Sequence, residues 1–165
     1  MPRSRSVVAL LALLAGAVVV VLVTVGGRPP PAPRGPAPTR ESAALWVLHT
    51  WDSRRATAYA TGSTTALRDL YVPGSRAGAA DLRVLHAYRA RALRVSGMRM
   101  QVLALSVLGS RPGWRRVRIT DRLVGAVAVR ADRRVRLPHD RASSRVMTMM
   151  RGGDGRWRVA SVTDG

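Results

Sequence analysis

The pattern of hydrophobic and polar residues divides the chain into a helical half and an alternating half. Apolar side chains recur every three or four residues in three segments, residues 39–62, 63–71 and 79–93, and this spacing predicts amphipathic helices. Gly62 is a typical helix stop, and Ser63 is a suitable N-cap for the second segment. We therefore expect three helices in the first part of the folded domain.

Beyond Gly97 the apolar positions recur at every second residue, which predicts β-strands. The run Gly152-Gly153-Asp154-Gly155 predicts a tight hairpin, because glycine and aspartate tolerate positive φ angles. The polar segment 131–142 contains Pro138 and is predicted to be a loop. Four strands are expected, joined as an antiparallel meander over residues 98–108, 114–130, 144–151 and 156–163.

One expected strand carries a carboxylate on its apolar side. The side chains predicted to face the core from it are Val117, Ile119, Leu123, Val127 and Val129. Asp121 falls on the same side, where burial of a carboxylate is costly unless an opposite charge pairs with it. Three explanations are open: an ion pair with an arginine of a neighbouring strand, a β-bulge that turns Asp121 outward, or a place in a functional pocket.

An uncharged segment near the N-terminus, Val7 to Val25, follows Arg3 and Arg5. As a helix it would span about 28 Å, close to the ~30 Å hydrocarbon core of a bilayer. It is longer than the usual apolar region of a signal peptide, and no Ala-x-Ala site follows it directly. We expect a retained membrane anchor, with a long cleaved signal peptide as the alternative.

The segment after the anchor is rich in Pro, Gly and Arg and lacks apolar periodicity, which predicts an extended stalk. Long domains are translocated with little regard to their charge. We therefore expect a single-pass anchor in the cell membrane, with the C-terminal domain outside the cytoplasm. The expected organisation is a cytoplasmic N-terminus at 1–6, a transmembrane helix at 7–25, a linker at 26–40 and a folded domain at 41–165.

The net charge of +19 calls for an anionic neighbour. All 28 basic side chains are arginine, a bias typical of a very GC-rich bacterial genome. Anionic lipid head groups, envelope polymers and nucleic acid all fit this charge. Nucleic acid is disfavoured, because it would require a cytoplasmic domain and because the basic segment 131–142 contains no aromatic residue on which bases could stack.

Several chemistries are excluded by missing residues. The chain has no cysteine, so it has neither a disulfide nor a thiolate metal site. It also lacks a glycine-rich phosphate loop, a metal-ligand cluster and a nucleophile elbow. We therefore expect no cofactor and no bound metal.

Three helices followed by a long antiparallel meander that ends in "GRWRVASV" resemble the NTF2-like superfamily. The resemblance covers Glu41 to Asp164 and implies an α+β fold, with three helices packed on a curved antiparallel sheet whose concave face lines a cavity. A single N-terminal span before such a domain also resembles the Mce-associated membrane proteins of high-GC bacteria, which are accessories of envelope lipid-transport systems.

We expect a binding or scaffolding domain rather than an enzyme, acting as an accessory of a cell-envelope complex with a membrane-protein partner. The resemblance implies an alternative: a small isomerase, lyase or cyclase in which Asp121 is the general base. Tyr59, Tyr88 and His86 are the further candidates for proton transfer or carbonyl polarisation in that cavity. A basic nucleic-acid-binding protein is the third hypothesis.

Overall fold

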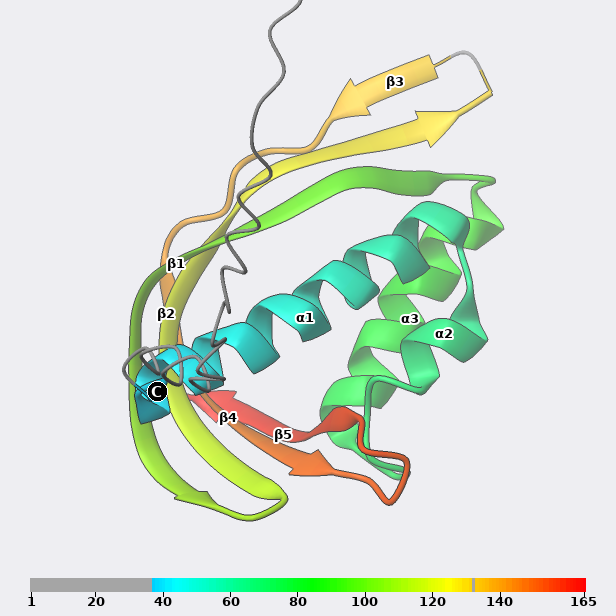
Figure 1. The fold of residues 1–165 in the computed structure, drawn as a ribbon. Coiled ribbons are helices and arrows are strands. Elements are labelled where there is room, and N and C mark those ends of the chain that lie inside the picture. Colours follow the sequence, from blue (N-terminus) through cyan, green and yellow to red (C-terminus); the bar gives the residue numbers. More distant parts are fainter. Residues whose placement is uncertain (1–36, 132) are drawn as a thin grey trace, which may run out of the picture. The chain divides into compact units, whose positions relative to one another are not determined.

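Three helices lie on the inner side of a strongly bent antiparallel sheet (Figure 1). The computed structural model describes residues 37–131 and 133–165. The helices are α1 (Arg40–Thr61), α2 (Thr64–Arg68) and α3 (Arg76–Ala90). The expected α+β class, with three helices on an antiparallel sheet, is confirmed.

No helix within 37–131 or 133–165 has the length and apolar character needed to cross a membrane. The predicted membrane segment, Val7 to Val25, and most of the predicted linker lie outside the described residues. The described residues form one compact unit.

Side-chain caps fix where the helices begin and end. The hydroxyl of Thr39 accepts a hydrogen bond from the backbone N–H of Ser42 at 3.1 Å, and α1 ends at Gly62 with a φ of 66°. Ser75 caps α3 in the same way as Thr39, through the N–H of Gly78. The third helix therefore begins before the predicted residue 79, and it stops at Ala90, short of the predicted residue 93.

The sheet contains five strands in the order β1-β2-β4-β5, with β3 paired to β2. Segment 131–142 was predicted to be a loop, and this is wrong for four of its residues, which form an edge strand. All four of these residues are exposed, so no burial pattern marked them as a strand. The strands are β1 (Arg94–Arg111), β2 (Trp114–Arg130), β3 (Arg133–Arg136), β4 (Ser143–Arg151) and β5 (Trp157–Asp164).

A bulge reverses the two faces of β2 partway along its length. Arg99 pairs with Gly125 but Met100 pairs with Leu123, so β2 carries an extra residue at this point. The residues buried beyond the bulge are Ala126 and Ala128, each 6% exposed. The prediction that Val127 and Val129 face the core is therefore wrong, because a single inserted residue moves every later side chain to the other face.

The core fills the space between the helices and the concave side of the sheet. Trp51 of α1 is 5% exposed, and its indole N–H donates to the carbonyl of Leu70 at 3.0 Å. The largest fully buried apolar side chains come from both layers, and they are Leu48, Leu67, Leu70, Leu85, Ile119, Met147, Met149 and Val159. Two carboxylates, Asp81 and Asp121, are buried with them.

Candidate functional site

Asp121 of β2 is 0% exposed and pairs with an arginine of the neighbouring strand. A guanidinium nitrogen of Arg145 on β4, Nη2, lies 2.5 Å from Asp121 Oδ2. The sheet register places Arg145 opposite Ile119 and Ser143 opposite Asp121, so the two charged side chains are diagonal neighbours. The ion-pair explanation is confirmed, and the explanation in which a bulge turns Asp121 outward is wrong.

A second carboxylate, Asp52 of α1, approaches this pair from the helical layer. Burial raises the pKa of Asp52 to about 6, although the positive charge of Arg55 acts in the opposite direction. The negative charge of Asp121 adds to the rise. Burial likewise raises the pKa of Asp121 above its usual value, against the influence of Arg145. Asp52 is thus a carboxyl group that exchanges its proton close to neutral pH.

The Asp52 cluster, defined here as Asp52, Asp121 and Arg145, is incompletely hydrogen-bonded. Within the described part of the chain, four buried side-chain atoms lack a hydrogen-bond partner, and three of them belong to this cluster. They are Asp52 Oδ2, Asp121 Oδ1 and Arg145 Nε. An unsatisfied buried polar group costs about 1–3 kcal/mol, so such a concentration of them marks a place where further polar groups would bind favourably.

Near Asp121, part of one edge of β2 is hydrogen-bonded by single backbone N–H groups, those of Leu137 and Asp140, and by no strand. On one edge of β2, β4 pairs with residues 114–121 and β3 pairs with residues 127–130, which leaves the stretch between them without a strand neighbour. A cavity of about 310 Å³ is lined there by Met100, Asp121, Arg122, Leu123, Asp140, Arg141, Ser143 and Arg145.

A larger cavity of about 770 Å³ lies between α1 and β1 and shares Met100 with the first. His49 lines it, one helical turn before Asp52, and is itself exposed. The two cavities therefore share the sheet position of Met100, and two members of the Asp52 cluster, Asp121 and Arg145, line the smaller one.

Another buried carboxylate, Asp81 of α3, is fully hydrogen-bonded, in contrast to Asp52 and Asp121. The guanidinium of Arg55 donates to both of its oxygens, at 2.6 and 2.5 Å. The hydroxyls of Tyr59 and Tyr71 add hydrogen bonds of 2.6 and 2.7 Å. Burial alone would raise the pKa of Asp81, but these donors, Arg55 foremost, lower it below the usual value. We call these four residues the Asp81 cluster.

The Asp81 cluster ties the helices together. Arg55 and Tyr59 come from α1, Asp81 comes from α3, and Tyr71 lies just after α2. None of the four side chains has a buried polar atom without a partner, with Nη1 of Arg55 donating to the sulfur of Met98 at 3.8 Å, and the ring of Trp51 packs edge-on against Tyr71, with 5.7 Å between ring centroids. Complete satisfaction of this kind is typical of a structural network rather than of a binding site.

The structure does not bring the other three proton-transfer candidates to Asp121. The hydroxyl of Tyr59 belongs to the Asp81 cluster. Tyr88 packs edge-on against Tyr59, with ring centroids 6.4 Å apart. His86 is exposed on α3.

Two residues were missed from the sequence: Arg145, which pairs with Asp121, and Asp52, whose pKa the charge of Asp121 helps to raise. A signal for Asp52 was present: it lies four residues after Leu48, on the buried stripe of α1.

No group of three or more His, Cys, Asp or Glu side chains suited to a metal ion occurs among residues 37–131 and 133–165. The Asp52 cluster instead combines one cation with two carboxyl groups, one of which gains or loses a proton near neutrality. It can accept hydrogen bonds at Asp52 and Asp121 and donate from Arg145. When Asp52 is protonated, its hydroxyl is a further donor.

No protein-family model matches the chain, and no curated protein matches it. Solved structures do. The intermembrane space region of the chloroplast protein ARC6 aligns with 80% of this chain and 98% of its own, at 15% identity and a TM-score of 0.52. Aln2 from a Streptomyces species aligns with 79% of this chain and 92% of its own, at 14% identity and a TM-score of 0.51. At such low identity the likeness concerns the fold alone, and that fold is the NTF2-like cone.

Proposed function

We propose that this chain is a membrane-anchored domain that binds a small polar ligand in its cone, at the Asp52 cluster. The observation that carries the proposal is that Asp121 and Arg145, each with a buried polar atom that lacks a hydrogen-bond partner, line a cavity of about 310 Å³. A ligand with both donor and acceptor groups would complete the hydrogen bonding of Asp52, Asp121 and Arg145. The gain in free energy would come from ending their unsatisfied state.

The binding proposal is tested with small hydroxyl and carbonyl compounds. Phenol and cyclohexenone are titrated into the full chain labelled with ¹³C at its methionine methyls. Met100 lines both cavities of the cone, so its methyl resonance is expected to shift. Met150 lies on the β4–β5 hairpin and lines neither cavity, so its resonance serves as the internal control. The shift of Met100 is expected to weaken in the Asp52→Asn and Asp121→Asn variants.

An unchanged Met100 resonance at saturating phenol and cyclohexenone would contradict binding in the cone. Equal shifts in the wild-type chain and in both variants would show that the ligand enters the cavity without using the Asp52 cluster. Either result overturns the proposed site.

Acid–base catalysis is the second candidate function, favoured by the pKa of Asp52 near 6. In a proton-transfer reaction Asp52 suits the role of base better than Asp121, because Arg145 holds Asp121 in an ion pair. The test is isomerisation of a β,γ-unsaturated cyclic ketone, in which a carboxylate removes the proton α to the carbonyl and returns it at the γ carbon. The rate is expected to rise as pH increases through about 6 and to disappear in Asp52→Asn.

Membrane anchoring is proposed from the sequence. Its support is the uncharged segment Val7 to Val25, preceded by Arg3 and Arg5. The full chain is expected to resist carbonate extraction, and a reporter active only outside the cytoplasm is expected to work when fused after Gly165. A mature form beginning near Arg28 in the soluble fraction would contradict the anchor. The role as an accessory of an Mce-type complex remains a prediction from the sequence.

A further inference from the structure

A third cavity lies between α1 and the hairpin that joins β4 to β5, and it shares no residue with the Asp52 cluster. Its volume is about 200 Å³. Three tryptophans, Trp46, Trp157 and the buried Trp51, line it together with three arginines, Arg54, Arg151 and Arg156, and its lining contains no carboxylate. Trp46 is 67% exposed, which is unusual for so large an apolar side chain. We call Trp46, Trp157 and the three arginines the Trp46 cleft.

The positive charges of the Trp46 cleft are uncompensated. None of its three arginines takes part in an ion pair within the part of the chain that the structure describes. The Nε of Arg151 donates to the carbonyl of Gly155 at 2.9 Å, which leaves its terminal nitrogens available. Arg115 stacks 5.0 Å from the ring centre of Trp157, and its buried Nη1 has no hydrogen-bond partner. An anion would accept hydrogen bonds from these guanidinium groups and balance their charge.

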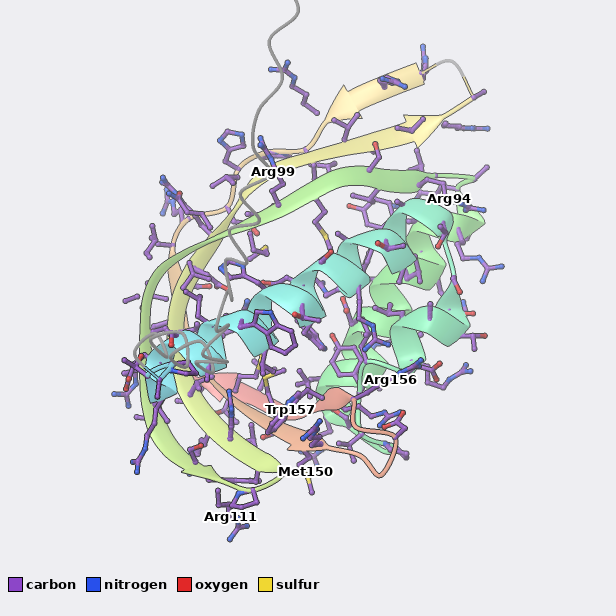
Figure 2. All side chains as sticks on the ribbon, in the orientation of Figure 1. Arg94, Arg99, Arg111, Met150, Arg156 and Trp157 are labelled. Carbon is purple, nitrogen blue, oxygen red and sulfur yellow. The ribbon has the colours of Figure 1, made fainter. Side chains whose placement is uncertain are left out.

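Apolar side chains are exposed at the same end of the molecule. Figure 2 shows Arg156, Trp157, Met150 and Arg111 together in the lower part of the view, near the β4–β5 hairpin and the β1–β2 turn. Met150 is 44% exposed. Arg111 stacks on Trp114 at 4.8 Å from the ring centre. Tryptophan and arginine beside exposed apolar side chains are the composition of surfaces that lie at a membrane interface.

We propose that the Trp46 cleft binds the phosphate head group of an anionic phospholipid and brings this end of the domain onto a membrane surface. Guanidinium groups bind phosphate through paired hydrogen bonds, and tryptophan rings are favoured at the level of the head groups. A lipid fits better than nucleic acid, because a cavity of about 200 Å³ holds one head group and offers no groove for a polynucleotide backbone. The exposed Met150 beside it suits the acyl boundary. The proposal extends the membrane location of the proposed function.

The test uses the full chain mixed with vesicles of phosphatidylcholine alone or with phosphatidylglycerol added. Flotation reports attachment, and quenching of tryptophan fluorescence by a lipid with a spin-labelled head group reports contact at the surface. Phosphatidylglycerol is expected to increase the quenching. Trp46→Phe is expected to remove a large part of that increase, and Arg54→Ala with Arg156→Ala is expected to weaken the interaction about 5-fold per arginine, since one basic residue near an anionic surface contributes about 1 kcal/mol.

A charge-matched control separates the cleft from general attraction. Arg133→Ala with Arg134→Ala removes the same charge from β3, which lies at the opposite end of the sheet from the β4–β5 hairpin (Figure 1). Because charges are screened over about 8 to 10 Å, this variant is expected to keep the quenching of the wild type. Equal losses in the two double variants, or a preference for a single-stranded oligonucleotide over the anionic vesicles, would overturn the proposal.

The outcome for the anchor is separate. If the wild-type chain does not float with phosphatidylcholine vesicles, the anchor proposal fails, and flotation with the phosphatidylglycerol vesicles then tests the Trp46 cleft by itself. If the chain floats with both kinds of vesicle, the difference in tryptophan quenching between them tests binding at the Trp46 cleft.

Discussion

Each of the two carboxylate clusters of this domain pairs a buried aspartate with an arginine, but the pKa shifts of their carboxyl groups are opposite. In the Asp81 cluster one carboxylate receives hydrogen bonds from a guanidinium and two tyrosine hydroxyls, and its pKa is lowered. In the Asp52 cluster the guanidinium of Arg145 pairs with Asp121, three polar atoms are unpartnered, and the pKa values of both carboxyl groups are raised. A buried acid therefore indicates a binding site when it lacks hydrogen-bond partners, whereas burial alone does not.

The largest effect is expected when the satisfied cluster is broken. Asp81→Asn leaves the guanidinium of Arg55 without its buried partner, so the free energy of unfolding is expected to fall by about 3 kcal/mol. Urea denaturation at neutral pH measures it. Asp154→Asn is the matched control, because Asp154 pairs with Arg158 at an exposed hairpin, and its loss is expected to be clearly smaller. Equal stability of Asp81→Asn and the wild type would end the structural interpretation of the Asp81 cluster.

The opposite sign is expected at Asp52. A carboxyl group with a raised pKa in the folded state favours folding below its unfolded pKa of about 3.9, and this contribution is lost as pH rises through about 6. Asp52→Asn removes the ionisation, so at pH values above 7 the variant is expected to be more stable than the wild type by about 2 kcal/mol.

Stability curves of the two proteins as a function of pH measure this effect. The difference is expected to shrink as pH falls from about 6 and to approach zero only below the unfolded pKa of about 3.9, because Asp52 is then protonated in both states. A variant less stable than the wild type at neutral pH would mean that the Asp52 carboxylate is satisfied after all.

A small change in stability is expected at Asp121, in contrast to Asp81. Asp121→Asn loses the hydrogen bond to Arg145 but also removes a carboxylate whose burial is unfavourable, and Arg145 is 28% exposed and can turn to water. The two effects are expected to cancel within about 1 kcal/mol. The same variant is expected to lower the pKa of Asp52, because the charge of Asp121 helps to raise it. A destabilisation as large as that of Asp81→Asn would erase the distinction between the clusters.

The smallest expected effect sharpens the comparison within the Asp81 cluster. Tyr71→Phe removes one hydrogen bond of 2.7 Å to Asp81 and is expected to cost about 1 kcal/mol. Tyr88→Phe is the control, since the Tyr88 hydroxyl forms no hydrogen bond within residues 37–131 and 133–165, and thermal unfolding is expected to show little change. Identical melting curves for the two variants would contradict a contribution from the Tyr71 hydroxyl.

The sequence predicted β2 with its observed ends, Trp114 and Arg130, because alternation is strong there and turns flank it. It did not predict β3, whose residues are all exposed and therefore carry no burial pattern. It also did not predict the bulge in β2, because the inserted residue depends on pairing with β1. Local periodicity specifies an element, whereas register is set by the neighbouring strand.

The candidate site was predicted in the same partial way. Asp121 was identified because a charge on an apolar strand face is conspicuous. The choice of Arg145 over the other strand arginines depends on the register of β4 against β2, which the sequence of either strand alone does not contain. Tyr59 was a candidate for the same cavity as Asp121, but its hydroxyl donates to Asp81, a partner that depends on how α1 and α3 pack and that the sequence does not show.

The most direct test of the account is a pH titration of the aspartate carboxyl ¹³C resonances, assigned with the Asp52→Asn, Asp81→Asn and Asp121→Asn variants. We expect Asp52 to titrate at a pH of about 6, Asp121 to titrate above its usual pKa and Asp81 to titrate below its usual pKa. If Asp52 and Asp121 instead titrate together with Asp81 at or below their usual pKa values, the Asp52 cluster is as well satisfied as the Asp81 cluster, and the claim that it is a binding site is contradicted.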